Sequence, residues 1–277
     1  MINIVGLGPS DETQLTLEAI EIINNGNRNY LRTEEHDSVN YFKKNNIEYT
    51  SFDYIYNSES TFEEVYEKIV EKLLLESKNC DINYFVPGHP LIAEKTVVKI
   101  LERTKDYNIV SGMSFIEPML NLVKRDPSKG FILIDGDDFS PYDINKSKDI
   151  IITQLYNTRV AIDLKLSLSE IYSDEYEIYI VWDAGLKEER VKKLPLYLID
   201  REEYNHRCAM YIPASDEINV SDVLKALEKQ LKDDDTKDID LQIDVFVESL
   251  KQIMTSYQLG EYTQTELIDM MYKKITL

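Results

Sequence analysis

The N-terminal segment INIVGLGPSD, residues 2–11, decides the fold of the first part of the chain. Ile2 to Leu7 form a short apolar run with high β propensity, and Gly8-Pro9-Ser10-Asp11 has the composition of a turn. Apolar residues then recur with helical spacing from Leu15 to Ile23, and Gly26 marks the expected end of that helix. This order of strand, turn and helix predicts the start of a βαβ unit.

The same alternation continues to about residue 122. The predicted elements are a strand at Tyr30-Leu31, a helix from about Ser38, a strand near Tyr49 to Tyr54, a helix opened by the capping box Ser60-Thr61-Phe62-Glu63, a strand at Ile82 to Val86, a helix at Leu91 to Arg103, and a strand beginning at Ile109-Val110. Because parallel strands need crossover helices, this pattern predicts an α/β domain whose parallel sheet is covered on both faces.

The pattern changes after Leu122. One clear helix, Arg159 to Tyr172, is accompanied by five strand-like runs: Phe131 to Ile134, Ile150 to Leu155, Tyr176 to Trp182, Leu196 to Ile199 and Ala209 to Ile212. A second α/β domain with a mixed sheet is therefore expected. Beyond Pro213 the strand signals give way to amphipathic helical segments. The predicted domains are residues 1–118, 119–213 and a helical segment, 214–277.

Composition limits the function. The 277 residues include 51 acidic and 31 basic side chains, for a formal net charge of −20. Such a charge repels nucleic-acid phosphates and anionic lipid headgroups, so we expect neither nucleic acid nor membrane as a partner. There is no apolar window of about 18 residues and no signal-peptide pattern, which favours a cytoplasmic protein. Cys80 and Cys208 are too far apart in the sequence to indicate a disulfide framework or a zinc site.

Three turns follow predicted parallel strands, at the edge where open α/β sheets bind ligands. Gly6-Leu7-Gly8 is a weak match to a dinucleotide-binding turn, because a third glycine is missing and Pro9 removes a backbone donor. Pro87-Gly88-His89-Pro90 fits either a small-molecule pocket or an ordinary strand-to-helix turn. In Gly112-Met113-Ser114, Ser114 is the expected N-cap of the next helix.

Together these turns resemble the tetrapyrrole methylase superfamily. The motifs that carry the resemblance are Val-Gly-Leu-Gly-Pro at 5–9, Val-Pro-Gly-His-Pro-Leu at 86–91 and Gly-Met-Ser at 112–114, followed by Ile151 to Asn157, Lys165 to Leu168, Asp183-Ala184-Gly185 and Pro195 to Arg201. They extend to about residue 213. The chain is most similar to the methylase half of bacterial proteins that are fused to a MazG-type nucleotide pyrophosphohydrolase.

The resemblance implies two α/β domains with S-adenosylmethionine in the cleft between them. The cofactor-binding residues implied by motif are Pro9, Gly88, His89, Ile92, Ser114, Phe115, Tyr156 and Ala184. Two positions depart from the family pattern. Ser10 replaces a usual glycine, which would reshape the turn if that position needed positive φ. His89 replaces the aspartate that is more frequent in the methylases proper.

The resemblance also implies methyl transfer, for which an acceptor held in line with the methyl carbon is enough and no catalytic triad is needed. No catalytic base is assigned. Tyr30, Arg32 and Gln154 are candidates for lining the cleft, with packing roles as the alternative. A carboxylate-rich tetrapyrrole fits a chain with net charge −20 poorly, so the expected acceptor is another small molecule or a peptide.

Residues 240–269 resemble the second half of a MazG domain, but most metal-binding acids of that family are replaced. Asp222 and Asp240 remain at ligand positions, and Lys237 puts a cation where Mg²⁺ needs an oxygen. We therefore expect no metal site and no hydrolysis of nucleoside triphosphates. Apolar helical faces in this segment are expected to pack on a second copy of the chain or on the body of the same chain, and the expected assembly is a homo-oligomer, a homodimer. The alternative function is a catalytically silent ligand-binding regulator or scaffold.

Overall fold

The computed structural model describes residues 1–215, 251 and 262–276. The chain divides into two compact units. The first comprises Met1–Lys124 and Asp183–Glu189, and the second comprises Arg125–Trp182 and Arg190–Leu277. The first unit is therefore discontinuous in sequence, because a short segment returns to it from the middle of the second.

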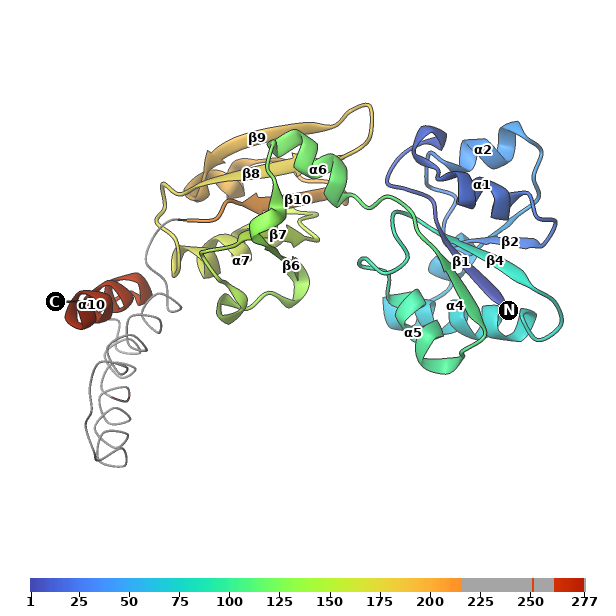
Figure 1. Cartoon of the computed structure of the whole chain (residues 1–277), viewed down its shortest axis with the longest axis horizontal. Coiled ribbons are helices and arrows are strands. Elements are labelled where there is room, and N and C mark those ends of the chain that lie inside the picture. The colour runs from blue at the N-terminus through green and yellow to red at the C-terminus, as the bar shows by residue number, and fades with distance from the viewer. Residues whose placement is uncertain (216–250, 252–261, 277) are drawn as a thin grey trace. The chain divides into compact units, whose positions relative to one another are not determined.

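The first unit is a five-stranded parallel sheet with helices on both faces (Figure 1). Its strands lie in the order β3-β2-β4-β1-β5. Their bounds are β1 (Ile2–Gly6), β2 (Arg28–Leu31), β3 (Thr50–Ser51), β4 (Ile82–Val86) and β5 (Tyr107–Val110). Helices α1 (Leu17–Ile23) and α2 (Val39–Lys44) cover one face, and α4 (Phe62–Glu76) and α5 (Lys95–Arg103) cover the other. The remaining helices are α3 (Asp53–Tyr56), α6 (Ile116–Val123) and the short 3₁₀ turn Glu12–Gln14.

Alternation along the central strands produces two separate hydrophobic cores. Ile2 and Ile4 of β1 pack with residues of α4 and α5, whereas Val5 packs with residues of α1 and α2. All five residues of both β1 and β4 are buried. Burial on both faces is the property expected of a parallel sheet with a helical layer on each side.

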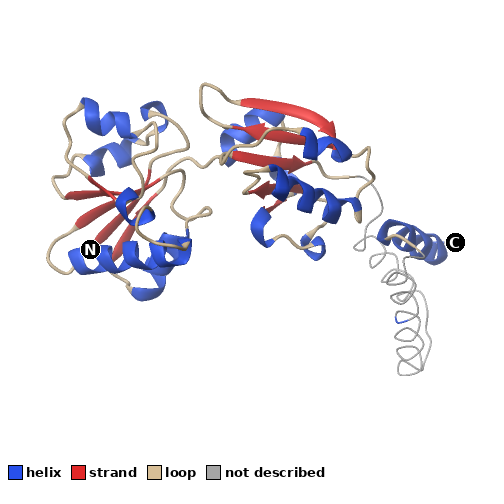
Figure 2. Ribbon diagram, turned by 180° about the vertical axis from the view of Figure 1, so that it is seen from behind, coloured by secondary structure: helices blue, strands red, loops and turns tan. Residues whose placement is uncertain are grey.

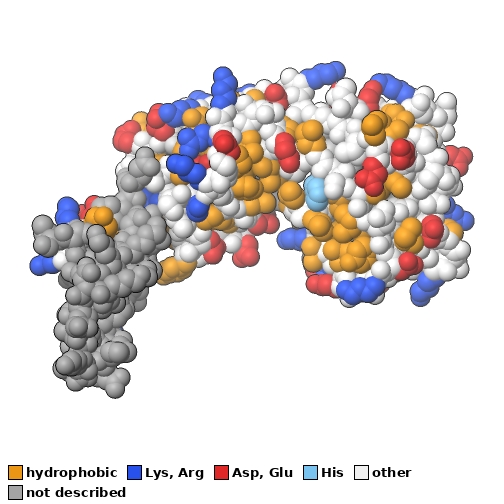
Figure 3. All heavy atoms as spheres, in the orientation of Figure 1, with side chains coloured by type: hydrophobic (Ala, Val, Ile, Leu, Met, Phe, Trp, Pro, Cys, Tyr) orange, Lys and Arg blue, Asp and Glu red, His pale blue; other side chains and the backbone are white. Residues whose placement is uncertain are grey.

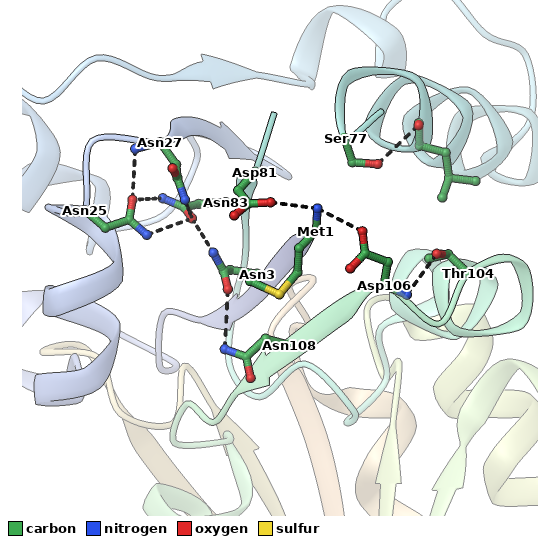
Figure 4. A network of polar contacts seen from close by, with 11 residues as sticks. Met1, Asn3, Asn25, Asn27, Ser77, Asp81, Asn83, Thr104, Asp106 and Asn108 are labelled. Atoms are coloured by element: carbon green, nitrogen blue, oxygen red, sulfur yellow. Dashed lines mark hydrogen bonds and ion pairs between the residues drawn. The ribbon is translucent and has the colours of Figure 1, made fainter. Parts of the chain in front are cut away.

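A ladder of asparagines crosses this sheet near its amino-terminal edge (Figure 4). Asn3, Asn29 and Asn83 occupy paired positions on β1, β2 and β4. The amide of Asn83 donates to Asn29 Oδ1 (2.9 Å) and to the Ile22 carbonyl (3.0 Å), and its Oδ1 accepts from Asn3 Nδ2 (2.9 Å). Asn108 on β5 extends the ladder by donating to Asn3 Oδ1 at 3.4 Å. Because the buried amides bond to one another, the polar residues are accommodated beside the core.

The second unit contains a mixed five-stranded sheet in the order β6-β7-β10-β8-β9 (Figure 2). Its strands are β6 (Phe131–Asp135), β7 (Asp149–Thr153), β8 (Glu177–Trp182), β9 (Arg190–Pro195) and β10 (Cys208–Ile212). β6 and β7 are parallel, and the other pairs are antiparallel. Its helices are α7 (Thr158–Ser169), the 3₁₀ helix Leu196–Arg201, three further 3₁₀ turns (Pro127–Lys129, Gly136–Asp138 and Pro141–Asp143) and the C-terminal α10 (Gln264–Thr276).

Trp182 lies in the core of this second unit and is the chain's one tryptophan. Its indole N–H donates to the Glu203 carbonyl at 2.8 Å, and the guanidinium of Arg190 lies 4.1 Å from the ring centroid. No helix among the described residues is long and apolar enough to cross a membrane. The predicted α/β class, with one parallel and one mixed sheet and a C-terminal helical element, is confirmed.

One predicted strand is shorter than expected, and another was wrong. The strand expected near Tyr49 to Tyr54 is reduced to Thr50–Ser51, since Phe52 and Ile55 are buried with the three-residue spacing of a helical turn. The strand expected at Leu196 to Ile199 is a 3₁₀ helix, in which Leu196 and Ile199 point into the core one turn apart.

One predicted helix start also shifts. The capping box of α4 is formed by Thr61 and Glu64, one residue later than expected. Thr61 Oγ1 accepts from the Glu64 amide at 3.3 Å, and the Glu64 carboxylate accepts from the Thr61 amide at 3.2 Å. Both Ser60 and Thr61 fit the motif by residue type, so the sequence alone left the register open by one position.

Candidate functional site

Glycines lie at or just after the ends of three neighbouring strands of the first unit, and their main chains lie close together. A Cβ atom added to Gly6, at the end of β1, would lie 2.5 Å from the Gly88 carbonyl oxygen and 2.6 Å from the Gly112 nitrogen. Gly8 and Gly88 also form an isolated antiparallel bridge, with N–H···O distances of 2.8 and 3.2 Å. The turns after β1, β4 and β5 are thus brought together at the carboxyl edge of the sheet, as the sequence predicted.

Gly88 offers an open stretch of main chain at this edge. Its φ is +67°, a left-handed conformation that favours glycine. A Cβ atom there would have one neighbour within 4 Å, the Met113 carbonyl oxygen at 4.0 Å. The residue is half-buried. A ligand could therefore approach the backbone of Gly88 closely, as the predicted cofactor contact requires.

The loop between Gly88 and α5 is held by its own hydrogen bonds. His89 Nδ1 accepts from the Leu91 amide at 3.1 Å, and the His89 carbonyl accepts from the Ile92 amide at 3.0 Å. Ala93 has φ +56° and so cannot belong to the helix, which begins at Lys95 rather than at the predicted Leu91. The half-buried His89 and Ile92 are the predicted cofactor residues in this loop.

Ser114 and Phe115 follow β5. Ser114 is buried, and both its amide and its hydroxyl donate to Glu117 Oε2, at 2.9 and 2.6 Å. The predicted capping role was wrong in position, because the N-cap of α6 is Phe115, whose side chain makes no capping bond. Ser114 still serves the helix start, since its Oγ accepts from the Ile116 amide at 3.0 Å. The half-buried Phe115 lies next to it in the turn.

The segment Asp183–Glu189 joins the first unit beside Pro9, which places Ala184 near the β1 turn. A Cβ atom on Gly185 would lie 3.2 Å from Pro9 Cγ and 3.4 Å from Gln14 Oε1. Gln14 Nε2 donates to the Gly185 carbonyl at 3.5 Å, and Gln14 Oε1 is buried without a hydrogen-bond partner in the described part of the chain. Such an atom fits a ligand that brings a donor.

Ser10, the first departure from the family pattern, does not strain the turn. It is buried and is not among the residues with positive φ, whereas Gly8 has φ +73°. The left-handed residue of this turn is thus a glycine in this chain, and a side chain at position 10 costs no backbone strain.

Tyr156 and Gln154 belong to the second unit. The Tyr156 hydroxyl donates to Asp137 Oδ1 at 2.9 Å, and this hydrogen bond to a carboxylate raises the pKa of Tyr156. Gln154 is exposed and has φ +59°. Their assignment to the ligand site stays a prediction, as does that of the residues in the first unit.

The other two candidates, Tyr30 and Arg32, have different surroundings. Tyr30 is 5% exposed and stacks on Phe52 at 5.6 Å between ring centroids, so it is a core residue. Arg32 pairs with Glu94, with 3.0 Å between Nε and Oε2. Sequence reasoning missed Glu94 because it assigned that residue to the interior of the helix. Among the described residues, no group of three or more His, Cys, Asp or Glu side chains is arranged to hold a metal ion.

Comparison with known proteins gives one family match and one curated relative. The family model described as tetrapyrrole (corrin/porphyrin) methylases matches residues 1–200. The uncharacterized protein YabN of Bacillus subtilis (strain 168) is 35% identical over 217 residues, which cover 76% of this chain. The chain spans 44% of the length of that relative.

Three solved structures, two of them of methyltransferases, share the fold. A cobalt precorrin-4 methyltransferase is 14% identical, with a TM-score of 0.59 over 76% of this chain and 94% of that one. A uroporphyrin-III C-methyltransferase from Thermus thermophilus, in complex with S-adenosylhomocysteine, is 15% identical, with a TM-score of 0.58 over 76% and 96%. A diphthine synthase is 13% identical, with a TM-score of 0.58 over 77% and 89%.

Proposed function

Because the chain belongs to the tetrapyrrole (corrin/porphyrin) methylase family, we propose that it is an S-adenosylmethionine-dependent methyltransferase whose acceptor is a small molecule or a peptide. The observation that carries this proposal is the open main chain at Gly88, on an edge where three strand ends meet. A neighbour of the same fold that binds S-adenosylhomocysteine supports the choice of cofactor.

The residues of the first unit fit the cofactor in kind. Gly88, His89 and Ile92 would present main-chain groups and an apolar side chain, and the orphaned Gln14 Oε1 would accept a hydrogen bond from an amino group. Pro9, Ser114, Phe115 and Ala184 complete the proposed set in this unit. Bound S-adenosylmethionine supplies an electrophilic methyl group on a sulfonium centre. The chain's task is then to hold the acceptor in line with that group, a contribution of several kcal/mol that needs no covalent intermediate.

The test compares two tryptophan substitutions. Gly88→Trp fills the open space at the strand edge, and Gly26→Trp is its matched control, because Gly26 also has positive φ (+82°) and no atom within 4 Å of its Cβ position. We expect calorimetric binding of S-adenosylmethionine to wild type and to Gly26→Trp, and a loss of at least about 100-fold in affinity for Gly88→Trp.

Ligand excess gives a second readout of the same proposal. At about 100 times its dissociation constant, a ligand stabilises the folded state by about 2.7 kcal/mol, which a thermal shift detects easily. If wild-type protein shows neither heat nor thermal shift with S-adenosylmethionine or S-adenosylhomocysteine, the methyltransferase proposal is wrong. The catalytically silent regulator or scaffold would then replace it.

We also propose that the C-terminal segment is a MazG-like remnant that does not hydrolyse nucleoside triphosphates. Its evidence, Asp222, Lys237 and Asp240, lies outside the described residues, so the proposal rests on the sequence. Hydrolysis needs several carboxylates to hold Mg²⁺. The assay is pyrophosphate release with Mg²⁺ or Mn²⁺. Metal-dependent release that an Asp222→Asn, Asp240→Asn double variant lacks would contradict the proposal.

Finally, we propose that the protein acts in the cytoplasm as a homodimer. The support for a homodimer is the sequence of the C-terminal segment, whose expected helices carry more apolar surface than they could bury against one another. Multi-angle light scattering of the full chain at several concentrations tests the second point, and a monomer at all of them would refute it.

A further inference from the structure

A buried ion pair lies beside the loop that carries Gly88, His89 and Ile92. Arg32 directly follows β2, and its amide donates to the Phe85 carbonyl at 2.9 Å, so it continues the parallel ladder beside β4. Its Nε lies 3.0 Å from Glu94 Oε2. The side chains of Arg32 and Glu94 are 22% and 6% exposed. Burying two charged groups has a large desolvation cost. We therefore looked for a role of this ion pair other than making the surface soluble.

Glu94 has a second structural role besides its ion pair with Arg32. The Glu94 carboxylate accepts from the Thr96 amide (3.2 Å) and hydroxyl (2.7 Å), which caps α5, and the Thr96 hydroxyl in turn contacts that of Tyr84 at 2.7 Å. For Arg32, the ion pair with Glu94 is the one polar side-chain contact that the described residues provide. Its Nε is buried and makes no hydrogen bond, and neither Nη atom has a hydrogen-bond partner among the described residues. One side of the guanidinium is therefore left with unused donors.

Two tyrosine rings flank this guanidinium. The Arg32 Cζ atom lies 5.6 Å from the ring centroid of Tyr56 and 5.7 Å from that of Tyr66. The hydroxyl of Tyr56 is buried and has no hydrogen-bond partner in the described part of the chain. Burial raises the pKa of Tyr56 to about 12, so this hydroxyl keeps its proton at neutral pH and can act as a donor.

The free donors have the geometry of a carboxylate-binding site. Burial is the largest single effect and lowers the pKa of Arg32, but the Glu94 carboxylate and the neighbouring tyrosines together outweigh it and raise the pKa, so the guanidinium stays charged. Nε lies at ion-pair distance from Glu94 without a hydrogen bond, and the Nη1 and Nη2 pair forms the planar fork that matches the two oxygens of a carboxylate. Tyr56, whose ring contacts the guanidinium, adds a second unpartnered donor, its buried hydroxyl.

We infer that Arg32 and Tyr56 bind a single carboxylate on the methyl acceptor, and that the body attached to this carboxylate is apolar or aromatic. This inference rests on the proposed function, because the ligand is the acceptor of the methyl group. The apolar wall is supplied by Tyr66 and by Phe62, whose rings stack at 6.3 Å. Phe62 is 69% exposed, which is unusual for a phenylalanine that serves only the core.

The wider surface of the first unit agrees with an apolar ligand body. Figure 3 shows hydrophobic side chains gathered over α5 and the loop before it. Leu91 in that loop and Val98 in α5 are each 52% exposed. Glu94 and the ionised Asp53 together outweigh the charge of Arg32, so the site would hold a carboxylate through its free hydrogen-bond donors rather than through net charge. A second carboxylate on the ligand would be repelled.

Glu94 also links this site to the proposed cofactor loop. It follows Ala93, the left-handed residue that ends the segment from Gly88 to Ala93. A shift of that loop would move Glu94 and hence the guanidinium it holds. The acceptor carboxylate and the cofactor loop are therefore supported by the same ion pair.

The experiment uses two probes of the same shape, phenylacetate and phenylacetamide, with the full chain and ligand-observed NMR titration. We expect phenylacetate to bind more tightly than phenylacetamide by about fivefold or more. Arg32→Lys keeps the charge opposite Glu94 but loses the fork, and should weaken phenylacetate by about tenfold. Arg28→Lys is the control at the start of β2, the strand that Arg32 follows, since the Arg28 side chain is 68% exposed and already pairs with Glu76.

Tyr56→Phe keeps the test meaningful if Arg32→Lys folds poorly. Its missing hydroxyl has no partner, so the variant should melt no lower than wild type while its affinity for phenylacetate falls about threefold or more. The inference is overturned if phenylacetate does not bind wild type, binds no better than phenylacetamide, or is unaffected by both variants. The affinity for S-adenosylmethionine is measured in parallel. If wild-type protein does not bind S-adenosylmethionine, the proposed function is wrong, but a preference for phenylacetate over phenylacetamide would still stand.

Discussion

Replacing Gly6 with alanine is expected to destabilise the first unit by about 3 kcal/mol through steric overlap alone. The new Cβ would lie 2.5 Å from the Gly88 carbonyl oxygen, 2.6 Å from the Gly112 nitrogen and 2.7 Å from the Gly112 Cα. All three are backbone atoms of neighbouring strand ends, so no side chain can rotate away. Gly6 does not have positive φ, and backbone strain adds nothing to the cost. For a unit of this size, about 3 kcal/mol corresponds to a melting temperature lower by roughly 6–12 °C.

The control is Gly26→Ala, which separates overlap from backbone strain. Gly26 has φ +82° and open space around its Cβ position, so alanine there costs only about 1 kcal/mol. Thermal unfolding is followed by far-UV circular dichroism, which reports both units, and by the fluorescence of Trp182, which reports the second. The reasoning fails if Gly6→Ala melts within about 2 °C of wild type, or no lower than Gly26→Ala.

Three further outcomes are expected. Asn83→Ala should cost about 3 kcal/mol in urea unfolding because several buried amide groups lose their partners, whereas Asn108→Ala, which removes one contact of 3.4 Å, should cost less than about 1 kcal/mol; equal losses would contradict this. Glu94→Gln should cost about 2 kcal/mol, since it leaves the partly buried Arg32 cation unpaired, and an unchanged midpoint would refute it. Burial raises the pKa of the Asp149 carboxyl, but hydrogen bonds and the neighbouring Arg125 guanidinium lower it below its usual 3.8. The ionised carboxylate therefore stabilises the fold above about pH 4, and this stabilisation is lost as the pH falls through the lowered pKa. Asp149→Asn should lose less stability than wild type below about pH 4, and parallel curves of unfolding free energy against pH for the two proteins would contradict this.

Most of the fold could be predicted because its strands and turns are specified by short, contiguous stretches of sequence. The five buried residues of β4 form one apolar run, and the glycines at 6, 8, 88 and 112 mark turns by residue type alone. The strand at Leu196 to Ile199 could not be separated from a 3₁₀ turn, because a four-residue apolar run fits both periods. The choice depends on the core that the run meets, which is a tertiary property.

The candidate site was predicted only in its main-chain part. The turn at Gly88-His89 can be predicted from its residue types. Its closeness to Gly6 is expected because the carboxyl ends of neighbouring parallel strands lie at the same edge of the sheet. The pairing of Arg32 with Glu94 could not be predicted in this way, because it joins the end of β2 to the start of α5 across 62 positions of sequence. Tyr56 was hidden for a different reason: its buried, unpartnered hydroxyl is a feature of packing that residue type cannot reveal.

The return of Asp183–Glu189 to the first unit has a consequence for how the protein is made. Gly185 packs beside Pro9, and its carbonyl accepts a hydrogen bond from Gln14. This residue is translated only after the whole segment Arg125–Trp182. At about 5–20 residues per second, the ribosome needs several seconds to make that segment. During this interval the nascent sheet carries an uncovered turn at the end of β1.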